Sequence, residues 1–155
     1  YNQKSTGRPS NPTHVTYSGY TDEKKDALYP FGFGLSYTDF EYGDLQLSSE
    51  EMDANGSIEA SITLSNIGNV EGKEIVQLYL RDLVASTTRP VKELKGFEAV
   101  NLAPGESKTV TFEIDEEMLQ FYNANRKWES EAGEFEVFIG GNSRDLQKAT
   151  FSLKK

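Results

Sequence analysis

The chain has 155 residues, which is enough for one domain with an appended segment and for burying roughly two thirds of its unfolded surface. Its net charge is −9 and its basic residues are scattered, which excludes the basic stripe of a nucleic-acid-binding protein. The absence of cysteine excludes disulfides and thiolate chemistry, and no apolar run approaches the ~18–20 residues of a membrane span.

The first segment, residues 1–28, is polar, is interrupted by glycine and proline, and follows neither the helical nor the strand period. We expect it to be a linker or a strap over a neighbouring domain. It contains His14, the only histidine, for which a Ser-His-Asp site is not expected because the segment has no obvious anchor. The chain begins at Tyr1 rather than Met and shows no signal peptide, which indicates a piece of a longer polypeptide.

Residues 29–40 (YPFGFGLSYTDF) gather aromatic side chains around proline and glycine directly before a strand-like run. Aromatic rings bury large apolar areas, so such a cluster in an acidic chain must be covered by something. Because Phe31 and Phe33 lie in a glycine-bearing loop, we expect them to be buried against a partner domain rather than to contact a ligand.

Alternation of apolar and polar residues predicts half-buried strands along the remainder of the chain. The apolar positions of these runs are Ile58, Ala60, Ile62 and Leu64; Val110, Phe112 and Ile114; Phe135, Val137 and Ile139; and Ala149, Phe151 and Leu153. Residues 74–80 add Ile75 and Tyr79 to a second face, which predicts a central strand covered on both sides. Within residues 40–47 the alternation changes parity at Gly43, which predicts a bulge.

Turn residues separate the runs, as at Asn55-Gly56, Pro104-Gly105 and residues 140–142. Residues 115–120 predict a single helical turn, with Asp115 as its N-cap. About seven short strands at this spacing predict an all-β fold, an antiparallel two-sheet sandwich.

Candidate metal and acid–base sites are weak. Glu51, Asp53 and Asn55 faintly suggest a calcium loop, but Ile62 stands where the bidentate glutamate should be, so an Asn-Gly hairpin turn is predicted instead. One histidine and no cysteine exclude a zinc site. We expect no metal and no cofactor.

The best candidate for a catalytic carboxylate pair is Glu134 with Glu136, which share one face of a strand roughly 6–7 Å apart. The opposite face is apolar, so both glutamates are expected on a solvated surface, where burial does not raise the pKa of one above that of the other. No catalytic residue is predicted.

Phe121, Tyr122 and Trp128 allow two interpretations: a sugar-stacking platform or part of the core. Trp128 comes just before residues 133–139, where a core tryptophan clamping the two sheets would lie, so a core position is predicted. The platform remains as the alternative, an independent carbohydrate-binding module with an exposed, roughly coplanar aromatic pair.

Several motifs, in order, resemble the C-terminal fibronectin type III-like domain of family 3 glycoside hydrolases. They are residues 29–40, 76–82 (VQLYLRD), 89–97 (RPVKELKGF), 102–112 (LAPGESKTVTF) and 132–140 (AGEFEVFIG). Residues 1–9 (YNQKSTGRP) are similar to the end of the preceding α/β domain. The resemblance implies an immunoglobulin-like sandwich over residues 29–155, with residues 1–28 as an irregular extension.

The resemblance further implies a non-catalytic accessory domain of a β-glucosidase or β-xylosidase, whose catalytic residues lie in a barrel and a middle domain without counterparts here. Its expected partners are those barrel and α/β domains, which it would brace. It would also shape outer substrate sites or oligomer contacts, and it would reach oligo- or polysaccharide only through the parent enzyme.

Tyr29, Phe31 and Phe33 would anchor the interface with the parent's other domains, and the guanidinium of Arg89 would add a planar set of hydrogen-bond donors. The excised chain would tend to form a homodimer. The family suggests a periplasmic or secreted location; an adhesion-type fibronectin repeat is a weaker alternative.

Overall fold

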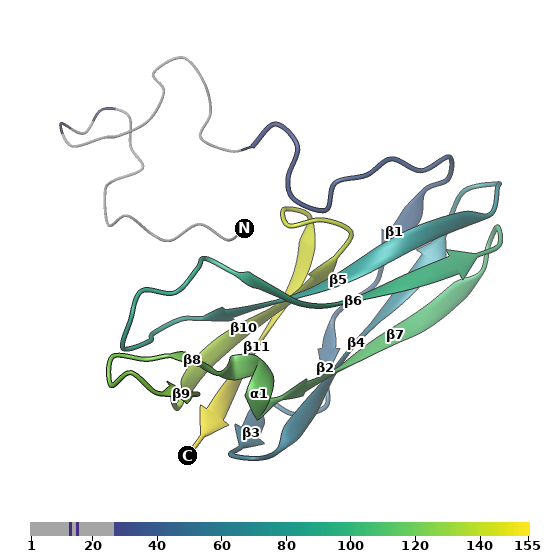
Figure 1. Cartoon of the computed structure of the whole chain (residues 1–155). Helices are drawn as coiled ribbons and strands as arrows, with labels where there is room; N and C mark the ends of the chain where they lie inside the picture. The colour runs from purple at the N-terminus through teal and green to yellow at the C-terminus, as the bar shows by residue number, and fades with distance from the viewer. Residues whose placement is uncertain (1–12, 14, 16–26) are drawn as a thin grey trace.

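A computed structural model describes residues 13, 15 and 27–155 of the chain (Figure 1). The prediction for His14, and most of the strap expected over residues 1–28, lie outside the described residues. The predicted division between the extension, residues 1–28, and the sandwich domain, residues 29–155, remains a prediction.

Two sheets pack face to face, and a short ribbon and one helical turn lie at one end (Figure 1). The first sheet contains β1 (Phe40–Tyr42), β2 (Gln46–Leu47), β4 (Ser57–Asn66) and β7 (Ser107–Asp115). The second has the order β3 (Glu51–Asp53), β11 (Leu146–Lys154), β10 (Gly133–Gly140), β5 (Gly72–Asp82) and β6 (Glu93–Leu102). The ribbon is β8 (Phe121–Tyr122) with β9 (Trp128–Glu129), and α1 is Glu116–Leu119.

The all-β sandwich predicted from the sequence is confirmed, with one difference in strand direction. β3 pairs with β11 in parallel, with Leu153 opposite Met52, whereas every other strand pair in the described residues is antiparallel. Residues 40–47 form two short strands on the same partner, β4. Tyr42 lies opposite Leu64 and Gln46 opposite Ser61, so four steps along this edge face three on β4. The extra residue lies between Tyr42 and Gln46, so a bulge is present close to the predicted position, although the N–H of Gly43 itself still donates to the carbonyl of Thr63 at 2.9 Å.

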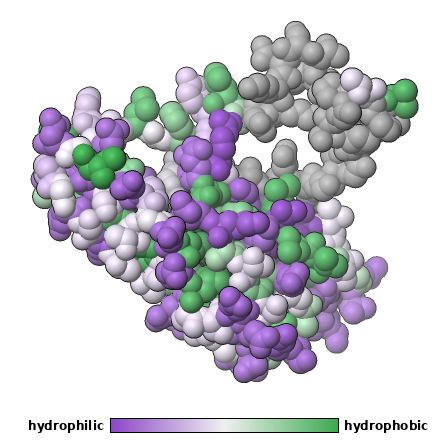
Figure 2. All heavy atoms as spheres, turned by 180° about the vertical axis from the view of Figure 1, so that it is seen from behind, coloured by the Kyte–Doolittle hydropathy of each residue, from purple (hydrophilic) through white to green (hydrophobic). Residues whose placement is uncertain are grey.

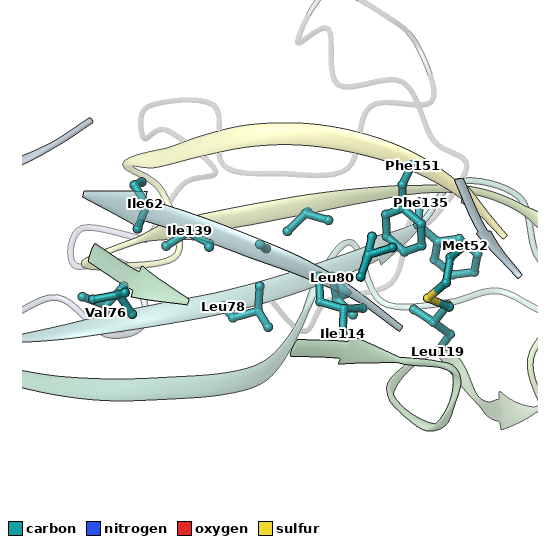
Figure 3. Packing of buried hydrophobic residues seen from close by; sticks show 14 of the residues in the cluster. Met52, Ile62, Val76, Leu78, Leu80, Ile114, Leu119, Phe135, Ile139 and Phe151 are labelled. Carbon is teal, nitrogen blue, oxygen red and sulfur yellow. The ribbon is translucent and has the colours of Figure 1, made fainter. Parts of the chain in front are cut away.

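The core lies between the two sheets, where the predicted apolar faces of β4, β7 and β10 meet. Ile62, Leu78, Phe135 and Phe151 are among its buried side chains (Figure 3). Each such side chain stabilises the fold by about 1.5–3 kcal/mol relative to an exposed one. β5 lies inside its sheet as predicted, and Tyr79 on its outer face is fully buried, but Ile75 on that face is exposed.

The predicted turn at Asn55-Gly56 is present, but it does not form a hairpin. Asn55 has a φ of 60°, and the N–H of Gly56 donates to the carbonyl of Asp53 at 2.9 Å. This turn connects β3 in one sheet to β4 in the other, so the two strands that it joins do not pair.

The predicted helical turn is also present, and Asp115 is its N-cap, accepting from the N–H of Met118 at 2.9 Å. The next residue, Glu116, connects three segments. Its carboxylate accepts from the hydroxyl of Ser130 at 2.6 Å, from the amine of Lys155 at 2.9 Å and from the N–H of Asn55 at 2.7 Å. These hydrogen bonds lower the pKa of Glu116 to about 2.

Candidate functional site

Residues 28–37, which we call the aromatic strip, are held to the second sheet by their backbone. The carbonyl of Phe31 accepts from the N–H of Ser143 at 2.8 Å, and the guanidinium of Arg144 donates to the carbonyl of Ala27, just before the strip. Residues 141–145 connect β10 to β11, so this connection fixes the start of the strip against the second sheet.

A side-chain amide on the outer face of β5 completes this attachment. The amide nitrogen of Gln77 donates to the carbonyl of Gly141 at 2.6 Å and, more weakly, to that of Gly32 at 3.4 Å. Its oxygen accepts from the buried hydroxyl of Tyr79 at 2.5 Å. Gly32 has a φ of +78° and lies in contact with Gln77, so the strip can approach the sheet this closely only where a Cβ is absent.

The rings of the aromatic strip remain partly exposed although its backbone is anchored. The exposed fractions of Tyr29, Phe31 and Phe33 are 66%, 47% and 45%. The rings of Tyr29 and Phe33 contact each other, with centroids 5.2 Å apart. Leu35 and Tyr37 further along are almost entirely exposed. The strip is therefore a segment with a fixed backbone and partly exposed aromatic side chains.

A groove of about 540 Å³ lies beside the strip and is lined by Phe33, Leu35, Tyr42, Glu74 and Ile75, among others. The hydroxyl of Tyr42 donates to the carboxylate of Glu74 at 2.8 Å. Burial raises the pKa of both groups, and the hydrogen bond from Tyr42 partly opposes the rise for Glu74. The groove combines an apolar wall with one acid–phenol pair, Glu74 and Tyr42. Among the described residues, those that line it include no nucleophile paired with a base, and no second carboxylate is bound to the Glu74–Tyr42 pair.

Arg89 lies apart from the aromatic strip, in the connection between β5 and β6, and is mostly buried. Its guanidinium contacts Glu93 at 2.8 Å and Asp82 at 3.5 Å, and its carbon lies 4.2 Å from the centre of the Phe121 ring. Burial opposes ionisation of both acids, but the hydrogen bonds from Arg89 and Lys95 lower the pKa of Glu93. Because these contacts engage the guanidinium within the chain, few of its N–H donors are available to another domain, as the predicted interface role would require.

The prediction of a core tryptophan is wrong. Trp128 is 66% exposed and lies opposite Tyr122, which is 61% exposed, on the β8–β9 ribbon. Of the three aromatics considered together, Phe121 alone is buried. The two sheets are instead joined by aliphatic side chains and by the stacked pair Phe135 and Phe151, whose centroids are 5.5 Å apart (Figure 3).

The expectation that Glu134 and Glu136 share a solvated surface is wrong for Glu136. This side chain is buried on the outer face of the second sheet and contacts Lys148 at 2.9 Å and Arg81 at 3.1 Å, whereas Glu134 is exposed. Neighbouring strands supply both cations, which the pattern along one strand does not reveal. The two glutamates therefore lie in different surroundings, with Glu136 held in a structural ion-pair cluster.

No group of three or more potential metal ligands among residues 13, 15 and 27–155 has an arrangement that could hold an ion. In the same residues, no helix has the length and apolar character required to cross a membrane.

The sequence is similar to known enzymes of carbohydrate degradation. The family described as "Fibronectin type III-like domain" matches residues 74–143. A periplasmic β-glucosidase of Salmonella typhimurium is 48% identical over 155 residues, covering 99% of this chain and 20% of that protein. A putative β-xylosidase of Formosa agariphila is 50% identical over 137 residues, covering 88% of this chain and 18% of that protein.

The fold is similar to a domain of a solved enzyme as well. The crystal structure of a β-glucosidase from Listeria innocua in complex with glucose aligns with a TM-score of 0.91 and 40% identity, covering 100% of this chain and 22% of that one. The chain thus spans about a fifth of the length of the relatives that it matches.

Proposed function

This chain belongs to the fibronectin type III-like domains of family 3 glycoside hydrolases, and we propose that it is the non-catalytic accessory domain of a β-glucosidase- or β-xylosidase-type enzyme. In this role it braces the barrel and α/β domains of its parent. Of the Glu134 and Glu136 pair, one carboxylate is exposed and the other is held in an ion-pair cluster, which does not match the paired carboxylates of a glycosidase site.

The observation that carries the proposal is the aromatic strip. Its backbone is fixed to the second sheet, yet the rings of Tyr29, Phe31 and Phe33 remain about half exposed or more. Partly exposed aromatic rings on a fixed backbone can supply interface energy at little entropic cost, because the backbone is already ordered. The strip also continues directly from residues 1–26, so it lies where a preceding domain would meet the sandwich.

The role assigned to Arg89 changes in this proposal. Because its guanidinium binds Glu93 and Asp82, we assign it to shaping the β5–β6 connection, and the strip alone provides the interface anchors. By analogy with the Salmonella relative, which is named periplasmic, the proposed location of the parent is the periplasm or the exterior.

Catalytic inactivity is tested directly on the purified chain. Incubated with nitrophenyl β-glucoside or β-xyloside, it should release no nitrophenol above the buffer rate. Hydrolytic activity that copurifies with the chain, and that persists when the chain is purified through a second, unrelated tag, would overturn the proposal.

The bracing role is tested by Phe31→Ala in two contexts. In the isolated chain the melting temperature should be nearly unchanged, whereas in a longer protein that includes the preceding domains it should fall by several degrees. Phe97→Ala, which removes an exposed ring on β6, is the matched control and should change neither. A large loss in the isolated chain would place Phe31 in the domain's own core instead.

A further inference from the structure

The β8–β9 ribbon presents two aromatic rings on one side. Tyr122 lies opposite Trp128, and Phe121 lies opposite Glu129. Successive residues of a strand point to opposite faces, so directly opposed residues share a face. Phe121 is buried against the domain beneath the guanidinium of Arg89. Tyr122 and Trp128 therefore both face outward, and both are more than half exposed.

A single buried asparagine holds the ribbon in shape. The N–H of Asn123 donates to the carbonyl of Lys127 at 2.9 Å, and its side-chain oxygen accepts from the N–H groups of Asn125 and Lys127 at 2.9 and 3.1 Å. Its side-chain nitrogen donates to the carboxylate of Glu129 at 2.6 Å. With these four bonds, the turn between the two rings is ordered before any ligand arrives, so binding has little ordering entropy to overcome.

The connection between β5 and β6 supports the ribbon from one side. The hydroxyl and N–H of Ser86 donate to the carboxylate of Glu131 at 2.5 and 2.9 Å, and the same hydroxyl lies 3.4 Å from the N–H of Ala124. In Figure 1 this connection and the ribbon lie together at one end of the sandwich, away from the β1 strand that follows the aromatic strip. The ribbon is thus a second aromatic surface, separate from the strip.

We propose that Tyr122 and Trp128 form a stacking platform for a β-linked saccharide. The face of an aromatic ring is electron-rich and attracts positively polarised hydrogens, such as the axial C–H groups on the flat face of a β-linked pyranose. Opposed residues on paired strands have Cβ atoms about 4.5–5.5 Å apart, so the two rings can contact one sugar unit or two adjacent ones. The exposed residues 124–127 place amide, guanidinium and ammonium donors at the border of the pair, within reach of sugar hydroxyls.

The size of the platform favours a saccharide over a protein. A stable protein interface buries about 800 Å² on each partner, much more than two rings provide. The rings are bordered by the polar and charged residues 124–127, and on the face seen in Figure 2 apolar side chains occur in small groups among polar ones. A narrow, flat, hydroxyl-rich ligand matches such a surface. The inference does not depend on the accessory role, because it uses none of the residues of the aromatic strip.

Trp128 is the only tryptophan in the chain, so its fluorescence reports on this site alone. Titration of the purified chain with cellotetraose, up to about 10 mM, should shift the emission to the blue and saturate. Maltotetraose, whose α-linkages curve the chain, should give a weaker response. Calorimetry with Trp128→Ala and with Tyr122→Ala should show affinity lower by about fivefold or more, the loss expected for one aromatic contact.

Phe97→Ala is the matched control, because it removes an equally exposed ring outside the ribbon, and should leave cellotetraose affinity unchanged. Three outcomes would overturn the proposal: no saturable response to either saccharide, equal affinity in the Trp128→Ala variant, or a concentration-dependent dimer in sedimentation that buries Trp128. The last outcome would assign the ribbon to a contact between two copies of the chain. Far-ultraviolet circular dichroism and an unchanged urea midpoint confirm that each variant keeps its fold.

Discussion

Two aromatic pairs in this molecule have almost the same ring separation and very different surroundings. Phe135 and Phe151 lie opposite each other on β10 and β11, with centroids 5.5 Å apart, and both are buried. Tyr29 and Phe33 lie in the aromatic strip, with centroids 5.2 Å apart, and both are exposed. A ring–ring contact is worth only about 0.5–1.5 kcal/mol by itself. The remaining energy comes from what covers the rings, so the first pair stabilises this domain and the second is available to another.

Removing a ring from the buried pair should have the largest effect. Phe135→Ala leaves a cavity in the core between the sheets, to which Met52 and Leu80 also belong (Figure 3), and should lower the free energy of unfolding by about 3–5 kcal/mol. Urea denaturation measures this loss as a lower midpoint with an unchanged slope. Phe135→Leu, which keeps most of the volume, should cost clearly less. A loss below about 1 kcal/mol for Phe135→Ala would show that the pair is not part of the core.

The attachment of the aromatic strip should come next. Gln77→Ala removes three hydrogen bonds: the one accepted from the fully buried Tyr79 hydroxyl and those donated to the carbonyls of Gly141 and Gly32. Because a hydrogen bond contributes about 0.5–1.5 kcal/mol, the variant should lose about 1–3 kcal/mol of stability. Unlike Phe135→Ala, this change should also accelerate hydrogen exchange at the N–H of Ser143, because the carbonyl of Phe31 that it binds would move.

The control for this change is Gln46→Ala on the exposed side of β2, which should stay within about 0.5 kcal/mol of the unsubstituted chain. If Gln77→Ala lowers stability but leaves exchange at Ser143 unchanged, the strip is held by contacts other than this amide.

Glu116 provides a smaller effect that depends on pH. Its pKa is about 2 in the folded chain against 4.5 for an unperturbed glutamate, so the folded state favours the ionised form. The resulting stability is present above pH 4.5 and is lost as the pH falls toward 2. Because solvent screens the interaction, we expect a contribution of about 1 kcal/mol. Glu116→Gln should flatten the pH dependence of the urea midpoint in this window, and Glu117→Gln, its exposed neighbour, should leave it unchanged.

The strands were predictable from sequence because alternation along one strand reports which face is buried, as for Ile58 to Leu64 on β4. The position of Trp128 was not, because β9 has only two residues and is too short to show a period. The burial of Glu136 depends on Arg81 and Lys148, which other strands bring beside it. Likewise, the number of aromatic residues in residues 29–33 predicts an interface there. The anchoring of this segment by Gln77 and Ser143 was not predictable, because it depends on contacts between distant parts of the chain.

The exposed aromatic pair should have the smallest effect on the isolated chain. Tyr29→Ala combined with Phe33→Ala removes two rings that are about half exposed or more, and surface changes of this kind usually stay within about 0.5 kcal/mol each. The urea midpoint should therefore barely move, in contrast to the loss of one ring from Phe135. In a longer protein with the preceding domains, the same double variant should destabilise the whole, since the rings would there be covered. A loss above about 2 kcal/mol in the isolated chain would instead mean that the strip completes this domain's own core, and the comparison between the two pairs would no longer hold.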